Sequence, residues 1–261
     1  MAHSNSSKVK MTEWGHQTMI IGVFGDVHGN LPALEAVLDD GKHNGVARWL
    51  CLGDMAFRGP APEECLRLIR GVCEDSTVMG NTEEWLPVGP PQGEATTPER
   101  QAMTETWWRW TIDRLDNDDL QWVRSLPLTR TFEFGANRLL CLHATARGPD
   151  DGLLPTAPDA VLRTAFRTSE HSLAACAHIH TPYLRRLDKC TVFNAGSTGR
   201  PVDGDPRSSY VILDLDLNHG AASINFRRVR YDVERTLLLA KEREFPWAGD
   251  YETALRNGVN F

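Results

Sequence analysis

Aspartate, asparagine and histidine residues stand at the ends of five short apolar runs of this chain. The motif GDVHGN, residues 25–30, follows the first run directly and carries an aspartate and a histidine two residues apart. The other four runs end in the same way, and the seven residues concerned are Asp26, His28, Asp54, Asn81, His143, His178 and His180. Their oxygen and nitrogen atoms are the ligand types that Mn, Fe, Zn or Ni accept in proteins. The pattern therefore indicates a metal site.

Each of these residues taken alone has a simpler explanation. Gly-Asp and Gly-Asn after a strand are ordinary turn sequences, and a single histidine is usually just a polar residue. Five buried runs that all end in a ligand type favour a shared site instead. In an α/β sheet, the carboxyl ends of the strands are where ligand-binding groups are normally presented.

The motifs also occur in a recognisable order. GDVHG, GDMAFRG, GNTEE, CLHA and AHIH match the signatures D-x-H, G-D-x-x-x-R-G, G-N-H-[DE], a lone His and G-H-x-H of the calcineurin-like metallophosphoesterases. The chain resembles this family from Met19 to about Tyr231, and NAGSTGRPVDGDPRSSYVILD is similar to the corresponding segment of its small bacterial phosphodiesterase branch. Two positions depart from the signatures: Thr82 replaces the His of G-N-H, and Ala177 replaces a Gly.

The resemblance implies two divalent metal ions, with Mn²⁺ expected and Fe, Zn, Ni or Mg as alternatives. One ion would be held by Asp26, His28, Asp54 and His180, and the second by Asp54, Asn81, His143 and His178. Asp54 would bridge the ions, and Asp54, Asn81 and His143 would be the catalytic residues. Hydrolysis would proceed by attack of a metal-activated hydroxide on phosphorus, without a covalent intermediate.

The function expected from this resemblance is hydrolysis of phosphodiester or nucleotide-type phosphate ester bonds. The alternatives are a phosphomonoesterase or protein phosphatase, and a non-catalytic metal-binding scaffold of the same fold. Arg58, Thr82 and Arg147 are the expected substrate contacts, with Arg147 the leading candidate for a phosphate. A solvated loop cation is the alternative reading of Arg58.

Composition limits the partners of the chain. Its 261 residues carry a net charge of −7 and an isoelectric point near 5.7, which disfavours binding to duplex nucleic acid and means that a small anionic substrate must be attracted locally. The family resemblance implies a small phosphorylated substrate, such as a nucleotide. Six cysteines without a C-x-x-C spacing indicate core thiols in a reducing cytoplasm. No signal peptide or membrane span is expected, and nothing indicates an oligomeric state.

The elements that must position these residues alternate first as strand and helix and later as hairpins. This order predicts a mixed α/β fold in which two stacked, mixed β-sheets are flanked by helices as a four-layer αββα sandwich. A flexible segment is expected over residues 1–18 and one domain over 19–261, with a lid or insertion at 82–116 and a C-terminal tail at 245–261. Tryptophans of the insertion are expected in the core, with stacking on a nucleobase as the alternative.

Overall fold

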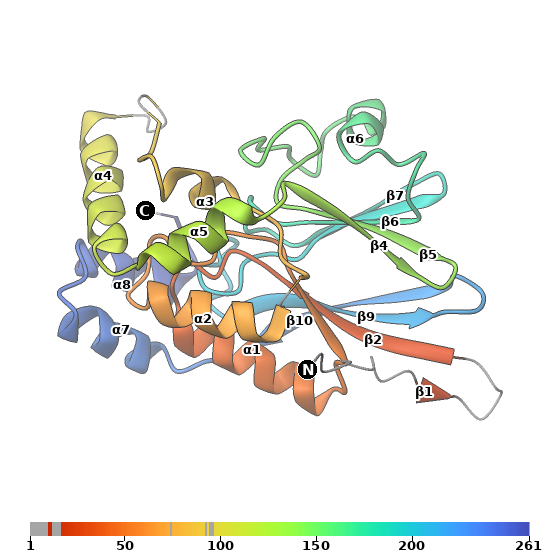
Figure 1. Cartoon of the computed structure of the whole chain (residues 1–261), viewed down its shortest axis with the longest axis horizontal. Helices are drawn as coiled ribbons and strands as arrows, with labels where there is room; N and C mark the ends of the chain where they lie inside the picture. Colours follow the sequence, from red (N-terminus) through yellow and green to blue (C-terminus); the bar gives the residue numbers. More distant parts are fainter. Residues whose placement is uncertain (1–9, 12–16, 74, 92, 94–96, 261) are drawn as a thin grey trace.

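The computed structural model describes residues 10–11, 17–73, 75–91, 93 and 97–260. Two five-stranded β-sheets pack face to face, and helices cover the outer face of each (Figure 1). The four-layer sandwich predicted from the sequence is confirmed. Among the described residues, no helix has both the length and the apolar character needed to cross a bilayer.

The first sheet is built around one apolar strand. Strand β2 lies between β3, which runs parallel to it, and β9, which runs antiparallel; β1 pairs with the start of β2, and β10 pairs with β9. Thr77 adds one parallel bridge beside β3. The strand bounds are β1 (Lys10–Met11), β2 (Gln17–Phe24), β3 (Arg48–Cys51), β9 (Ser208–Asp216) and β10 (Ala222–Val229).

The second sheet has the strand order β4-β5-β6-β8-β7. Its three central strands β5, β6 and β8 are parallel, and an antiparallel hairpin partner closes each edge. The strand bounds are β4 (Thr129–Phe134), β5 (Asn137–Leu142), β6 (Leu173–Cys176), β7 (Tyr183–Leu187) and β8 (Cys190–Asn194).

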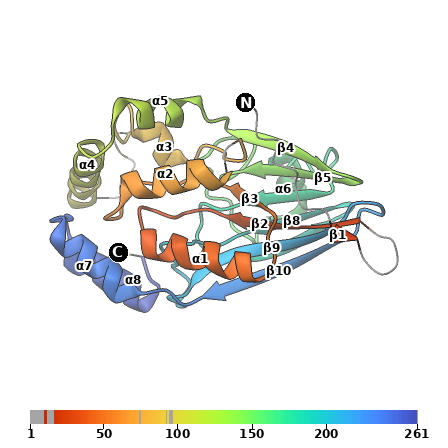
Figure 2. The same cartoon turned by 60° about the horizontal axis from the view of Figure 1, so that its bottom comes forward.

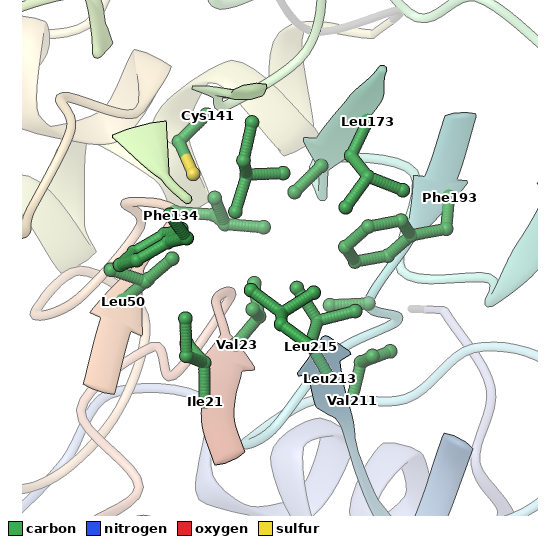
Figure 3. Close-up of a cluster of buried hydrophobic side chains, with 14 of the residues drawn as sticks. Ile21, Val23, Leu50, Phe134, Cys141, Leu173, Phe193, Val211, Leu213 and Leu215 are labelled. Atoms are coloured by element: carbon green, nitrogen blue, oxygen red, sulfur yellow. The ribbon is translucent and has the colours of Figure 1, made fainter. Parts of the chain in front are cut away.

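The main core lies between the two sheets (Figure 3). Alternate residues of β2 and β9, such as Ile21, Val23 and Leu213, point into it because side chains alternate between the faces of a strand. Leu173 and Phe193 of the second sheet meet them from the other side. Each such side chain contributes about 1.5–3 kcal/mol by leaving water, so this layer fixes how the two sheets are placed.

The helices follow from local capping and one-sided apolar patterns. Asn30 begins α1 by accepting the backbone N–H of Ala33, and α1 and α2 cover the first sheet, whereas α6 covers the second. The helix bounds are α1 (Leu31–His43), α2 (Pro62–Cys73), α3 (Asn81–Trp85), α4 (Pro98–Ile112), α5 (Asn117–Ser125), α6 (Asp159–Ala165), α7 (Val233–Glu242) and α8 (Ala248–Asn257).

Helices α4, α7 and α8 gather at one end of the sandwich (Figure 2). Their buried side chains form a separate cluster, here called the aromatic cluster, whose fully or nearly buried members are Phe57, Trp85, Trp107, Ala240, Phe245, Tyr251 and Leu255. Residues from the expected insertion and from the expected tail therefore share one core. The expected boundary at residue 18 falls inside β2, and residues 1–9 and 12–16 lie outside the described residues.

Candidate metal centre

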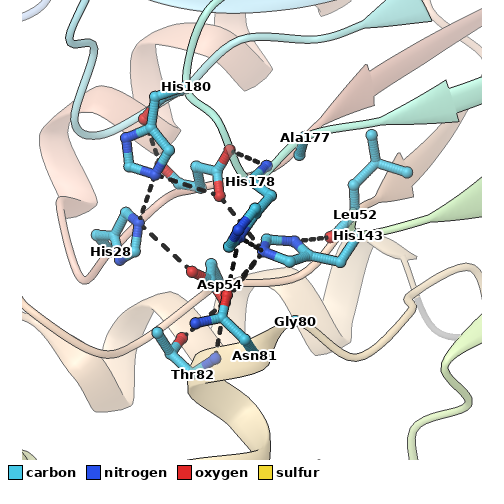
Figure 4. Close-up of polar contacts among 12 residues, drawn as sticks. His28, Leu52, Asp54, Gly80, Asn81, Thr82, His143, Ala177, His178 and His180 are labelled. Atoms are coloured by element: carbon cyan, nitrogen blue, oxygen red, sulfur yellow. Dashed lines mark hydrogen bonds and ion pairs between the residues drawn. The ribbon is translucent and has the colours of Figure 1, made fainter. Parts of the chain in front are cut away.

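The loops that follow β2, β3, β5 and β6, together with the start of α3, converge at one edge of the sheets (Figure 4). All seven side chains predicted to bind metal lie in this cluster. Close side-chain contacts join His28 Nε2 to His180 Nε2 at 3.0 Å and Asn81 Oδ1 to His143 Nε2 at 3.1 Å. His178 Nδ1 lies 3.1 Å from the same Asn81 oxygen.

The ligand atoms fall into two overlapping groups. Asp26, His28 and His180 form one, and Asp26, Asp54 and His143 form the other, with the ligand atoms of each within 4.8 Å of one another. Asp54 also reaches both sides, because its Oδ2 is 3.6 Å from His28 Nε2 and its Oδ1 is 3.5 Å from His143 Nε2. Both carboxylates thus stand between the two halves of the cluster.

Carbonyl oxygens fix the direction of three imidazole rings. Nδ1 of His28 lies 2.9 Å from the carbonyl oxygen of Phe57, and Nδ1 of His143 lies 2.7 Å from that of Leu52. His180 makes the same contact at 2.6 Å with a carbonyl of the loop after β8. A carbonyl only accepts, so each Nδ1 carries a proton, and each ring turns its Nε2 into the cluster.

The nitrogen and carboxylate oxygen atoms that face into the cluster suit a bound cation. Burial lowers the pKa of His28 to about 3, so its Nε2 faces that of His180 as a neutral acceptor at pH 7. Oδ1 of Asp26 is fully buried and receives no hydrogen bond. Burial alone would raise the pKa of Asp26, but the neighbouring His180, His143 and His28 outweigh it and keep that pKa well below its ordinary value. Buried acceptors of this kind are satisfied by divalent metal ions.

The backbone is strained at most of the ligand residues themselves. Five of the seven ligand residues have left-handed φ angles, between 46° for His28 and 69° for His178. A non-glycine residue in this region costs on the order of 1–3 kcal/mol when the surroundings impose it, and such residues concentrate at functional sites. Positions 53 and 80 need glycine because a side chain has no space there. A Cβ on Gly53 would lie 2.4 Å from Gly80 N, and a Cβ on Gly80 would lie 2.2 Å from Asp54 Oδ1.

Comparison with known proteins identifies the domain. Residues 19–218 match the calcineurin-like phosphoesterase superfamily domain. The chain belongs to this superfamily. The metal-dependent phosphoesterase activity of the superfamily and the two candidate ligand groups agree, so the chain is a metal-dependent phosphoesterase.

Two solved structures and one further sequence are similar to this phosphoesterase over most of its length. A metallophosphoesterase from Sphaerobacter thermophilus is 27% identical, with a TM-score of 0.75 over 92% of this chain and 99% of that one. A hypothetical protein, PH1004, from Pyrococcus horikoshii shares the fold, with 19% identity and a TM-score of 0.77 over 93% of this chain and 100% of that one. An uncharacterized protein, MJ0912, from Methanocaldococcus jannaschii is 28% identical over 88% of this chain and 96% of its own length.

Two residues of α3, Thr82 and Glu83, hold Asp54 and its loop in place. Thr82 donates to Asp54 Oδ1 twice, from its backbone N–H at 3.0 Å and from its hydroxyl at 2.8 Å, and only 1% of Thr82 is exposed. Glu83 is fully buried and accepts the backbone N–H groups of Asp54, Met55 and Gly80 at 2.6, 2.8 and 3.0 Å. Glu83 was missed in the sequence, although a Glu three residues after Gly80, at the start of a helix, has the spacing of a capping box.

The three expected substrate contacts are in different surroundings. The guanidinium carbon of Arg58 lies 5.3 Å from the ring of Phe57 and 5.8 Å from that of Trp107, at the edge of the aromatic cluster. The side chain of Arg147 is 51% exposed and pairs with Asp151 at 2.6 Å. The hydroxyl of Thr82 faces Asp54, which favours a role in orienting that carboxylate over a substrate contact.

The tryptophans of the insertion belong to the core. Trp107 is 2% exposed and donates its ring N–H to the carbonyl of Pro246, and Trp85 is 7% exposed. Trp108 donates its ring N–H to the carbonyl of Leu86. These contacts hold the insertion to the domain, and of the two alternatives for the tryptophans, Trp107 takes the core position, where its face is covered.

Proposed function

We propose that the chain is a dinuclear phosphoesterase that hydrolyses phosphodiester or nucleotide-type phosphate ester bonds. The observation that carries the proposal is the pair of overlapping ligand groups, in which the carboxylates of Asp26 and Asp54 each reach both halves. Asp26, His28, Asp54 and His180 would hold one cation, and Asp54, Asn81, His143 and His178 the other. Mn²⁺ is the ion we propose, since carboxylate, amide and imidazole ligands all suit it.

Divalent cations bound here would supply positive charge for an anionic ester and would lower the pKa of a water molecule. The residues of the chain do the rest. The carbonyl-bound imidazoles keep their lone pairs directed inward, Thr82 and Glu83 hold the Asp54 loop, and Arg58 offers a guanidinium to the ester oxygens. These contacts hold the ligand side chains in place before a substrate binds.

The environment of Thr82 supports the preference for diesters. In the phosphatases that this chain resembles, a histidine at this position is thought to protonate the leaving group. A hydroxyl that is bound to Asp54 does not supply a proton comparably near pH 7, so the leaving group must depart as an anion. Activated esters and diesters with good leaving groups meet that condition better than alkyl monoesters.

A small phosphorylated substrate also agrees with the charge of the chain. Its net charge of −7 repels extended polyanions, whereas the cluster attracts an anion locally. All six cysteines are buried free thiols, and this supports the reducing, cytoplasmic location that we propose.

Metal analysis combined with a substrate comparison tests the proposal. Elemental analysis should find two divalent ions per chain, and bis(4-nitrophenyl) phosphate should be hydrolysed faster than 4-nitrophenyl phosphate. Asp54→Asn should lose metal and at least about a hundredfold in rate, since Asp54 is the ligand that the two proposed cations share. Asp188→Asn is the matched control, because Asp188 is exposed and pairs only with the surface residue Arg163 among the described contacts.

Three results would decide against the proposal. One ion per chain would remove the dinuclear centre. Faster hydrolysis of the monoester than of the diester would favour a phosphomonoesterase or protein phosphatase. Metal without hydrolysis of either ester would favour a binding scaffold.

A further inference from the structure

The core between the two sheets ends in a groove at the end of the sandwich opposite the metal centre. This cavity of about 580 Å³, here called the distal groove, lies between the edge strands β7 and β10 of the two sheets. Its lining includes Asn137, Leu184, Arg186, Lys189, Thr191 and Ile224. Asn137 begins β5, whereas the metal ligand His143 follows the end of that strand. A six-residue strand spans about 20 Å, so the distal groove is a site of its own.

The alternation of side chains along β7 directs one cation into the groove. Tyr183 and Leu187 pack on the side of α6, and their neighbour Arg185 on that face pairs with Asp159. Arg186 therefore points to the opposite side of the strand, toward the first sheet.

A second cation stands at the turn between β7 and β8, where Lys189 lines the same groove. Neither Arg186 nor Lys189 forms an ion pair with another described residue. Within the described part of the chain, none of the residues that line the groove is acidic. In a chain with a net charge of −7, this groove is therefore a local site for an anion.

Asn137 provides an acceptor in the wall of the groove. It lies on the face of β5 that carries Leu139 into the core, and only 1% of it is exposed. Its Nδ2 donates to the carbonyl of Asp216 at 3.2 Å, but its Oδ1 has no hydrogen-bond partner among the described residues. Buried polar atoms are normally paired, so this oxygen suits a donor carried by a ligand.

The amide is held firmly, because the β4–β5 and β9–β10 hairpins meet at this end of the molecule (Figure 1). The backbone N–H of Ala136 donates to the carbonyl of Leu217 at 3.1 Å. The acceptor is thus fixed before a ligand enters.

The remaining walls are apolar or carry a hydroxyl. Leu184 and Ile224 lie on the two edge strands, and Leu184 is 38% exposed, so a ligand can reach it. Thr191 adds a hydroxyl. Sites for small molecules usually measure about 300–1,000 Å³ and combine apolar walls with a few polar groups. The distal groove has this size and character, with a positive side and an isolated acceptor.

We propose that the distal groove binds a purine mononucleotide. Arg186 and Lys189 hold its phosphate, the base lies against Leu184 and Ile224, and an amino group of the base donates to Asn137 Oδ1. A phosphate supplies the negative charge, and a purine supplies a flat body with a donor at its edge. The inference does not depend on the proposed function, because no metal ligand takes part.

Calorimetric titration of the whole protein with adenosine 5′-monophosphate tests the phosphate contacts. Arg186→Gln and Lys189→Gln should each weaken binding by at least about tenfold, since each removes a charged hydrogen-bond donor. Arg124→Gln is the matched control, because Arg124 is exposed on α5 and also has no ion pair among the described residues. Binding should persist within about twofold in Asp54→Asn, which lacks the ligand that the two proposed cations share.

A second set of probes tests the base. Purine riboside 5′-monophosphate, which lacks only the amino group, should bind about fivefold more weakly than adenosine 5′-monophosphate, and Asn137→Ala should remove this difference. Ala222→Trp, at an exposed position of β10 that lines the groove, should block binding while both cations remain. If Asn137→Ala does not fold, Ala222→Trp and the two cation variants decide.

Two results would overturn the inference. The first is binding that disappears in Asp54→Asn and is untouched by Arg186→Gln, which would assign the nucleotide to the metal centre. The second is an affinity for inorganic phosphate equal to that for adenosine 5′-monophosphate, since the base would then make no contact. A failure of ester hydrolysis would refute the proposed function and leave these binding measurements unaffected.

Discussion

Replacing Thr82 with valine should weaken the metal centre without changing the shape of its surroundings. Valine has nearly the same volume as threonine but lacks the hydroxyl that donates to Asp54 Oδ1 at 2.8 Å. The backbone N–H of residue 82 would still donate at 3.0 Å, so the carboxylate would lose one of two bonds from this residue. A hydrogen bond to a charged group contributes about 1.5–3 kcal/mol.

The size of the effect follows from this value and from the length of the chain. Unfolding entropy near the midpoint is about 2.1 cal/mol/K per residue, or roughly 0.55 kcal/mol/K for 261 residues. A loss of about 2 kcal/mol should therefore lower the Tm of the metal-free Thr82→Val protein by roughly 4 °C. The affinity for Mn²⁺ should fall by roughly 10- to 100-fold, as expected when a group that orients a ligand is removed.

Thr82→Ser separates orientation from packing. Serine keeps the hydroxyl and loses a buried methyl group, which costs about 1 kcal/mol. Its Tm should fall slightly while its Mn²⁺ affinity, measured by calorimetry, stays within about threefold of wild type. If Thr82→Val binds Mn²⁺ as tightly as the wild type does, the hydroxyl does not orient Asp54 and the reasoning fails.

Other predictions concern substrate binding, the leaving group and the surface. Arg147→Ala should raise KM by about tenfold with metal content unchanged, if this side chain leaves Asp151 to bind a substrate phosphate; unchanged kinetics would transfer that role to other arginines. Across a series of aryl phosphodiesters, the rate should fall steeply as the leaving-group pKa rises, and a shallow slope would reveal a proton donor that we have not identified. Asp40→Asn should cost no more than about 1 kcal/mol at pH 7 in urea unfolding. Burial raises the pKa of Asp40, but bonds from Arg227 and Tyr210 outweigh this and lower it below 3.8. The ionised form therefore stabilises the protein above pH 3.8, and the difference between variant and wild type should disappear as the pH falls through the lowered native pKa.

The sequence predicted the sheets and the position of the cluster because both depend on local patterns. Apolar runs followed by polar ligands mark strands that end at one edge, and local caps such as Asp116 at the start of α5 mark where helices begin. The apolar run that precedes Asn81 forms only one bridge, at Thr77, since Met79 donates its N–H to the carbonyl of Pro127. Short runs leave such boundaries to tertiary contacts.

Contacts between distant segments could not be predicted from the sequence. Nothing local in the last residues indicates chemistry, yet Asn260 reaches Arg200 across sixty positions of the chain. The pairing of Arg147 with Asp151 was also missed, although Arg147 itself was singled out as the leading phosphate ligand. Only the fold shows which partner each charge meets.

The strand order of the first sheet has a consequence for synthesis of the chain. Strand β2 ends at Phe24, and its antiparallel neighbour β9 does not begin until Ser208. At about 5–20 residues per second, a ribosome needs roughly 10–40 s to make the residues between them. During that interval the nascent chain presents an apolar strand with one edge unpaired. The metal centre cannot assemble before its last ligand, His180, has been synthesised. Chains whose synthesis stalls before β9 should therefore aggregate or recruit chaperones. Metal should bind only late in the synthesis of the chain.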